Sequence, residues 1–151
     1  MQVEIQSKYY YKNLPHNIKL YNHHYIMQDI KNQSDLYKLV DEFYKKLLSD
    51  KSISYIFNDV VRIKIEEHLP ILVTFWSQLL FDTGGYTNNL TNIHLEIDKK
   101  EHLSPELFKI WINYFNSTVD ELFMGEKTEK IKSQALQLAT IMQIKIQNNP
   151  N

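Results

Sequence analysis

The stretch from His68 to His94 constrains the fold of this chain more than any other part of its sequence. Apolar residues that lie four, seven, eight, eleven and twelve positions after His68 form one face of an α-helix: Leu72, Phe75, Trp76, Leu79 and Leu80. The pair Gly84-Gly85 then ends the pattern, because adjacent glycines destabilise a helix and permit positive φ angles. After this break, Leu90, His94 and Ile97 return to helical spacing. Two helices with one histidine each on an apolar face could hold a flat, metal-centred group between them.

The rest of the composition favours an all-α fold. The 151 residues include only 3 glycines and 4 prolines, and the periodic segments are long. Hydrophobic residues make up 43% of the chain, which is enough for one domain with a sizeable core. No internal repeat or linker divides the sequence.

Further helices are expected on both sides of the central stretch. Ser34 resembles an N-cap, Pro70 lies either near the start of its helix or at a bend in it, and Ser104-Pro105 is a strong helix start. Gly125 suits the end of that helix. The expected helices are 34–49, 60 or 62 to 81, the segment around His94, 105–124 and 128–146, with a short connector at 52–58 and a charged loop at 98–102.

The N-terminal part, residues 1–33, is interpreted as an extension that is partly helical from Tyr25 to Ile30. Its pair His23-His24 could bind a metal ion. No carboxylate or third histidine stands at ligand spacing, so a polar surface segment is the favoured interpretation. The main domain is expected at 34–147, followed by a polar tail at 148–151.

Charge and cysteine usage exclude several classes of function. The net charge is −1 with acidic and basic residues interleaved, so no nucleic-acid surface is expected. The absence of cysteine excludes disulfides, thiolate ligands, iron–sulfur clusters and covalent haem attachment. No apolar run approaches the roughly 18–20 residues that span a bilayer, and the N-terminus lacks a signal-peptide core. The sequence therefore predicts a cytoplasmic protein without a membrane partner.

Four polar residues on apolar faces are the candidates for chemistry. A neutral imidazole is a good ligand for haem iron, and His94 has apolar neighbours that suit a porphyrin. His68 could bind iron, hydrogen-bond a ligand or gate a pocket. Tyr44 and Trp111 carry polar tips that need partners when buried, and a diatomic ligand is one such partner. Each residue considered alone is more often a core residue bonded to the backbone. No catalytic triad, phosphate-binding loop, dinucleotide fingerprint or zinc spacing is present.

An ordered set of short pieces resembles the truncated haemoglobins, specifically group III, over 34–144. The absence of glycine before Gly84 favours group III, because groups I and II also use paired-glycine turns earlier in the chain. The pieces are Glu42-Phe43-Tyr44, Tyr55-Ile56-Phe57-Asn58, Glu67-His68, Phe75-Trp76, Gly85-Tyr86, Ile93-His94-Leu95, Pro105-Glu106-Leu107-Phe108, Ile110-Trp111, Gln134-Ala135, Ala139 and Met142.

The resemblance implies a truncated globin fold, a two-over-two helical sandwich, with haem b as its cofactor. His94 would be the proximal iron ligand and His68 the distal histidine, with coordination of iron by His68 left open. Tyr44 and Trp111 would be the distal hydrogen-bonding pair. The remaining cofactor-binding candidates are aromatic residues of the pocket or core: Phe57, Trp76 and Tyr86.

Two functions of different classes follow from this reading. The leading hypothesis is a haem-binding globin that reversibly binds oxygen or another diatomic ligand, with redox or detoxifying activity toward nitric oxide or peroxide left open. A reductase would be a partner, and the protein would be a monomer or weak dimer. The alternative is a haem-free helical sensor or protein-interaction domain on a globin-like core, in which the four polar residues serve packing alone.

Overall fold

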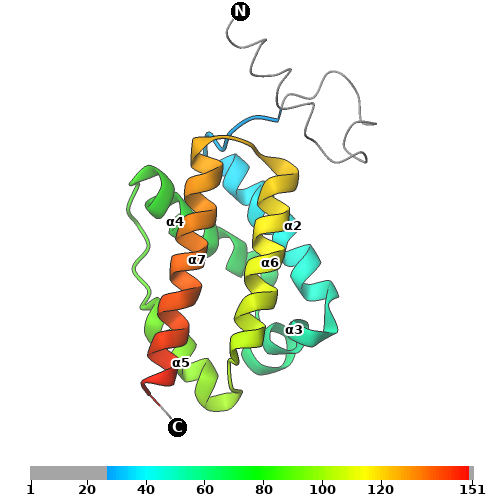
Figure 1. Cartoon of the computed structure of the whole chain (residues 1–151), viewed down its shortest axis with the longest axis vertical. Helices are drawn as coiled ribbons and strands as arrows, with labels where there is room; N and C mark the ends of the chain where they lie inside the picture. Colours follow the sequence, from blue (N-terminus) through cyan, green and yellow to red (C-terminus); the bar gives the residue numbers. More distant parts are fainter. Residues whose placement is uncertain (1–26, 150–151) are drawn as a thin grey trace, which may run out of the picture.

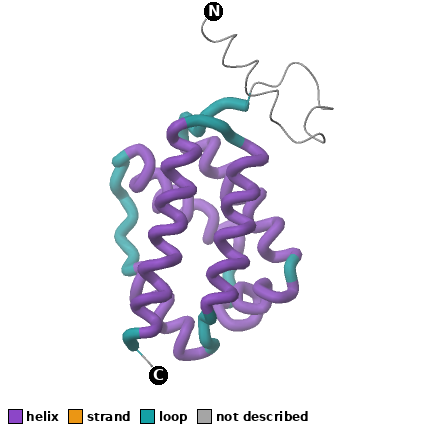
Figure 2. The backbone as a smooth tube through the Cα atoms, viewed as in Figure 1, coloured by secondary structure: helices purple, strands orange, loops and turns teal. Residues whose placement is uncertain are grey.

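The computed structural model of the chain describes residues 27–149. Within this range every regular element is helical, which confirms the all-α expectation (Figure 2). The expected His23-His24 pair, most of the N-terminal extension and the last two residues lie outside the described range. The elements are α2 (Gln33–Ser49), α3 (Lys51–Tyr55), the π-helix η1 (Ile56–Val61), α4 (Ile65–Phe81), α5 (Leu90–Lys100), α6 (Pro105–Leu122) and α7 (Glu126–Gln147).

Four of the helices form two layers. Helices α6 and α7 lie side by side and antiparallel at the front of Figure 1, with α2 and α4 behind them. Helix α2 packs against α4 and α6, and α7 packs against α6 and α4, so each layer contacts the other. Helix α5 lies along the C-terminal half of α7. This arrangement is the two-over-two sandwich that the resemblance implied.

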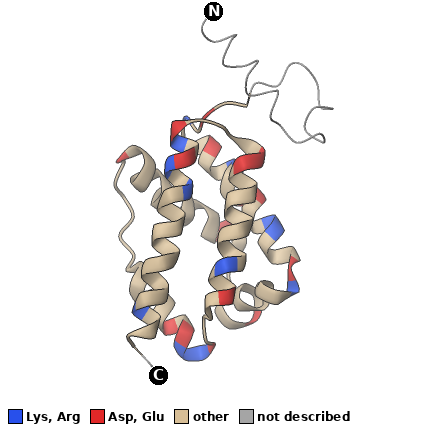
Figure 3. Ribbon diagram, viewed as in Figure 1, with Lys and Arg blue, Asp and Glu red and all other residues tan. Residues whose placement is uncertain are grey.

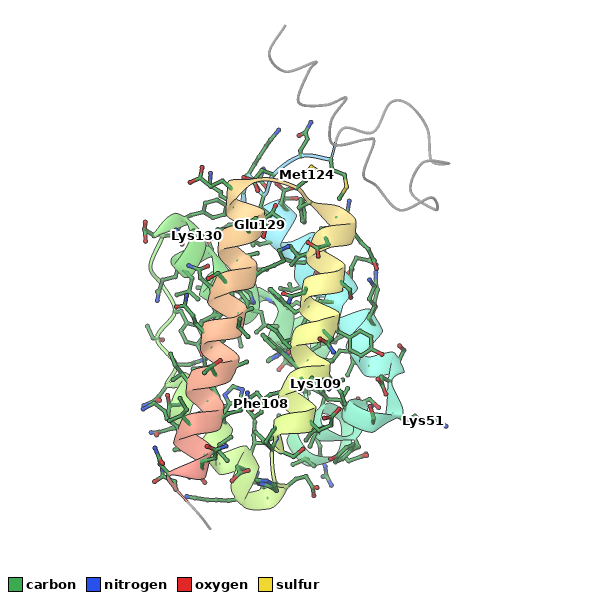
Figure 4. All side chains as sticks on the ribbon, viewed as in Figure 1. Lys51, Phe108, Lys109, Met124, Glu129 and Lys130 are labelled. Carbon is green, nitrogen blue, oxygen red and sulfur yellow. The ribbon has the colours of Figure 1, made fainter. Side chains whose placement is uncertain are left out.

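The apolar faces of these helices meet in the space between the layers. Leu39, Phe43 and Leu47 recur at helical spacing on α2 and are buried, as are Phe115 on α6 and Ile131 on α7. Burial of such a side chain stabilises the fold by roughly 1.5–3 kcal/mol. A second cluster lies nearer α5 and includes Phe108, which Figure 4 labels between α6 and α7. Charged positions gather toward the ends of α6 and α7, and the middle of both ribbons is mostly uncharged (Figure 3).

Two helix starts differ from the sequence expectation because distant or earlier residues supply the caps. The N-cap of α2 is Asn32, whose side chain accepts a hydrogen bond from Asp35 N at 3.0 Å, and not Ser34. Helix α7 begins at Glu126, two residues early, because Asp29 accepts hydrogen bonds from Lys127 N at 2.9 Å and Thr128 N at 2.8 Å. Residues 27–30, expected to be helical, are not.

Three connections also differ from expectation. The segment 52–58 is helical, with α3 continuing into the π-helix η1. The expected loop at 98–102 is mostly helix, because Asp98 is buried and accepts hydrogen bonds from Leu103 N at 2.7 Å and His102 Nδ1 at 2.9 Å. Helix α6 ends at Leu122, before Gly125, which lies at the start of α7.

Helix α4 begins at Ile65, later than the expected start at 60 or 62, because residues 56–61 form the π-helix η1. The start lies three residues before His68, as the first alternative expected, and Pro70 lies inside the helix. In the described part of the chain, no helix is both long and apolar enough to cross a membrane.

Candidate functional site

Two of the predicted site residues meet directly. The phenol oxygen of Tyr44 on α2 lies 3.0 Å from Nε2 of His68 on α4, and the two rings pack edge to face at 5.3 Å. Tyr44 is 5% exposed, and burial raises its pKa, so the phenol stays protonated. Burial also lowers the pKa of His68, so its imidazole is neutral at pH 7. The pair is therefore a neutral hydrogen bond with one proton between its two heavy atoms.

Trp111 lies beside this pair but does not hydrogen-bond to it. Its ring packs edge to face on Phe43 at 5.6 Å, and Phe43 in turn contacts Tyr44 at 5.3 Å. Trp111 also stacks on Phe115 with an interplanar angle of 9°. Among residues 27–149 the indole N–H has no hydrogen-bond partner. Trp111 is thus linked to the Tyr44–His68 pair through the ring of Phe43.

His94 is held by its own helix. Its Nδ1 lies 2.8 Å from the carbonyl oxygen of Leu90, one turn earlier on α5, and donates a hydrogen bond to it. Burial lowers the pKa of His94, and the bond to Leu90 opposes this only in part, so the ring is neutral at pH 7. With the proton on Nδ1, Nε2 carries a lone pair, and no residue in the described range hydrogen-bonds to it. This is the state in which an imidazole ligates a metal.

Phe57 packs on Tyr44 and belongs to a segment that contacts α5, the helix of His94. It lies in η1, and its ring packs edge to face on Tyr44 at 5.6 Å. Both Phe57 and Leu90 pack against the main core and against the second cluster, and η1 contacts α5. Helix α5, which carries His94, therefore contacts the π-helix that contains Phe57.

The other two aromatic candidates lie farther along the same core. Trp76 is 3% exposed and stacks on Phe115 at 4.9 Å, which fits the core alternative rather than the pocket. Tyr86 follows the glycine turn and packs on Phe75 at 5.0 Å. Its backbone N–H donates to Gln78 Oε1 at 3.1 Å, which ties the loop to α4. The cofactor-binding roles of Trp76 and Tyr86 stay predictions.

Two groups that hold α5 and its histidine in place were not predicted from the sequence. The first is the Leu90 carbonyl, whose partnership with His94 follows from i, i+4 spacing on a helix and could have been found that way. The second is Asp98, whose capping of the α5–α6 junction gave no signal inside an acidic and basic run.

Neither a cluster of metal ligands nor a surface depression brings the candidate residues together in residues 27–149. Within residues 27–149 no group of three or more histidine and acidic side chains could hold a metal ion, so a metal bound by His94 would need further ligands of its own. A surface depression of about 320 Å³ between α5 and the end of α7 contains none of the candidates. Its lining residues are Asn92, Leu95, Glu96, Asp98, Lys99 and Asn149.

The donor set fits haem, whose porphyrin supplies the remaining ligands itself. Such a group needs one neutral imidazole from the protein and apolar walls. His94 offers the imidazole, and Leu90, one turn earlier, and Phe57, against Tyr44, are half-buried apolar residues.

Comparisons with known proteins agree with this geometry. No family model matches the chain. The group 3 truncated haemoglobin ctb of Campylobacter jejuni is 28% identical over 115 residues, which cover 74% of this chain and 88% of that protein. The crystal structure of the group III truncated haemoglobin from Campylobacter jejuni superposes with a TM-score of 0.69 at 26% identity, over 83% of this chain and all of that one. Protein OPG064 of Variola virus is 28% identical over 100 residues, which are 14% of its length.

Proposed function

Because this chain belongs to the group III truncated haemoglobins, we propose that it binds haem b through Nε2 of His94 and reversibly takes up oxygen or another diatomic ligand. The observation that carries the proposal is the hydrogen bond from His94 Nδ1 to the Leu90 carbonyl. This bond fixes the tautomer and the ring orientation, as the outer partners of metal-bound histidines commonly do. Ferrous haem supplies an iron atom with one open position for a small ligand.

The distal side of the proposed pocket is made by Tyr44, His68 and Trp111. The phenol O–H and the indole N–H are donors, and in a dry pocket a donor stabilises partial negative charge on a ligand more strongly than in water. Tyr44 is buried, and Phe43 holds it beside Trp111. Their role is to orient a diatomic ligand and slow its release. The same donors would polarise peroxide or favour a reaction with nitric oxide, so a detoxifying activity is consistent with the proposal.

The biological setting follows from this chemistry. Reversible oxygen binding requires ferrous iron, so a reductase that returns the ferric form is the implied protein partner. We propose a cytoplasmic protein that acts as a monomer or weak dimer, without nucleic acid or membrane as partners.

Absorption spectroscopy of the full chain with added haem tests the proposal. We expect one haem per chain, a spectrum of imidazole-ligated iron on reduction, and a sharp Soret shift with carbon monoxide. If the reduced form is six-coordinate before carbon monoxide is added, His68 or another side chain also binds the iron. Weak uptake without defined coordination would reject the globin function and favour the haem-free sensor or interaction domain.

A further inference from the structure

A continuous line of aromatic rings runs from the candidate site to the surface. Trp111 stacks on Phe115 at 5.4 Å, and Phe115 stacks on Trp76 at 4.9 Å with an interplanar angle of 27°. Trp76 packs edge to face on Phe75 at 5.1 Å, and Phe75 packs on Tyr86 at 5.0 Å. The line crosses α6 and α4 and ends in the loop between α4 and α5.

The order of residue types along this line is suited to one-electron transfer. Trp111, Trp76 and Tyr86 have side chains that can lose an electron. Phe115 and Phe75 do not, but each bridges two that can by direct ring contact. Each oxidisable ring is therefore separated from the next by a single packed benzene ring. Trp76, in the middle, is 3% exposed and is shielded from solvent reductants.

The two ends differ in their access to water. Trp111 shares Phe43 with Tyr44 and so lies at the proposed haem pocket. Tyr86 is half-buried in a loop whose neighbouring residues, Gly85 and Thr87, are exposed. Its backbone bond to Gln78 holds the ring against Phe75. Burial raises the pKa of Tyr86, so the phenol is protonated and must release its proton to water when it is oxidised.

We propose that Trp111, Trp76 and Tyr86 form a relay that moves single oxidising equivalents from the haem pocket to the surface, where Tyr86 accepts electrons from small one-electron reductants of the phenol or ascorbate class. The inference rests on the proposed function for the source of the oxidant, but the relay itself is a property of the aromatic side chains.

The step balances with peroxide as the oxidant. Reduction of one peroxide to two waters at the haem would take two electrons and two protons, and Tyr86 would supply both electrons through Trp76 and Trp111, one in each of two identical turns. The phenol of Tyr86 releases its proton to water and becomes a phenoxyl radical. An external reductant then returns one electron, water returns the proton, and the reductant is left oxidised by one electron. A donor too large for the pocket can thus reduce the protein from outside.

Tyr44 is the alternative residue on which the radical could form in place of Tyr86. It also lies one ring from Trp111, and His68 could accept its proton. However, it is 5% exposed, so an external reductant cannot reach it. A radical held there would remain inside the protein. The test therefore separates Tyr44 from Tyr86.

The first arm needs no haem. Azide radicals from pulse radiolysis oxidise tryptophan in the full chain, and the decay of the indolyl band and the rise of the phenoxyl band are followed, with helix content checked by circular dichroism. We expect a fast phase that is independent of protein concentration in the wild type. Tyr86→Phe, which removes only a hydroxyl, and Trp76→Phe should both abolish this phase. Tyr37→Phe, an exposed tyrosine on α2, should retain it. Persistence of the phase in Tyr86→Phe, its loss in Tyr44→Phe alone, or its absence in the wild type would overturn the relay.

The second arm uses the haem-loaded chain with hydrogen peroxide and a spin trap, and the adducts are located by peptide mass spectrometry. We expect the main adduct on Tyr86 in the wild type and its loss in Trp76→Phe. Adducts confined to Tyr44 would contradict the relay. If the chain takes up no haem, this arm reports failure of the proposed function, while the azide arm still decides the relay.

Discussion

The phenol oxygen of Tyr44 and Nε2 of His68 lie 3.0 Å apart and join α2 to α4 beside the proposed haem pocket. Only one proton lies between these two atoms, because burial keeps the phenol protonated and the imidazole neutral. When His68 donates to Tyr44, the phenol O–H is free to donate to a ligand. When Tyr44 donates to His68, it is not. Under the proposed function, the availability of the Tyr44 O–H to a distal ligand therefore depends on this shared hydrogen bond.

The first prediction concerns Tyr44→Phe in the haem-loaded protein. Loss of the phenol donor removes one hydrogen bond to the ligand, and a bond worth about 1.4 kcal/mol corresponds to about a tenfold faster release. Stopped-flow measurement of oxygen dissociation checks the rate. Tyr37→Phe on the exposed face of the same helix should leave it unchanged. An oxygen dissociation rate in Tyr44→Phe equal to that of the wild type would show that Tyr44 makes no contact with the ligand.

The second prediction concerns acid stability. Burial places the pKa of His68 below its ordinary value of 6.5 in the folded state, so the unfolded chain takes up the proton first as pH falls. The contribution of His68 to stability is therefore complete above pH 6.5 and declines below it until the folded-state pKa is passed. Urea unfolding across this window should show a smaller decline for His68→Gln than for the wild type. Identical declines would show that His68 does not contribute to the pH dependence.

The third prediction concerns Asp29, which caps α7 from a distant part of the chain. Burial raises its pKa, but hydrogen bonds from Lys127, Thr128 and Ile30 outweigh that effect and hold the pKa below its ordinary value. Asp29→Ala should reduce the free energy of unfolding by about 1–2 kcal/mol, as loss of an N-cap does. Asp41→Ala, which removes only a helix ion pair with Lys45, should cost about 0.3–0.5 kcal/mol. Urea unfolding measures both, and equal costs would contradict the capping role.

The fourth prediction couples Asp29 to Gly125. Gly125 has φ +153°, and a Cβ atom there would collide with the side chain of Asp29. Gly125→Ala should therefore be more destabilising in the wild type than in Asp29→Ala, where part of the collision is relieved. The free energies of unfolding of the two single variants and the double variant form the required cycle. Additive costs would show that the two residues do not interact.

Periodicity predicted the helices of this chain well, because their positions depend on local patterns of apolar residues. The faces of α2, α6 and α7 follow from spacing alone, and Ser104-Pro105 marks the start of α6 correctly. The start of α7 could not be predicted in the same way. It depends on Asp29, which is far away in sequence and meets Thr128 only after the chain has folded.

In the candidate site, too, a contact within one helix could be predicted from the sequence, whereas contacts between helices could not. The pairing of His94 with Leu90 is local to one helix and is readable from spacing. The pairing of Tyr44 with His68 joins two helices, and no spacing pattern in the sequence predicts it. The resemblance implied only that Tyr44, Trp111 and His68 all lie on the distal side. The structure places Trp111 one ring away, on Phe43, because Trp111 stacks on Phe115 in the core. Contacts between helices depend on how the layers pack, which periodicity does not specify.

The most direct test of the central claim is the spectrum of reduced, haem-loaded His94→Gly with and without free imidazole. The account predicts that the variant loses the wild-type spectrum and its carbon monoxide complex, and that imidazole in the vacated position restores both. His102→Gly removes an exposed histidine just beyond the same helix and should keep the wild-type spectrum. A His94→Gly protein that binds haem with an unchanged reduced spectrum and carbon monoxide complex, without imidazole, would show that His94 is not the iron ligand.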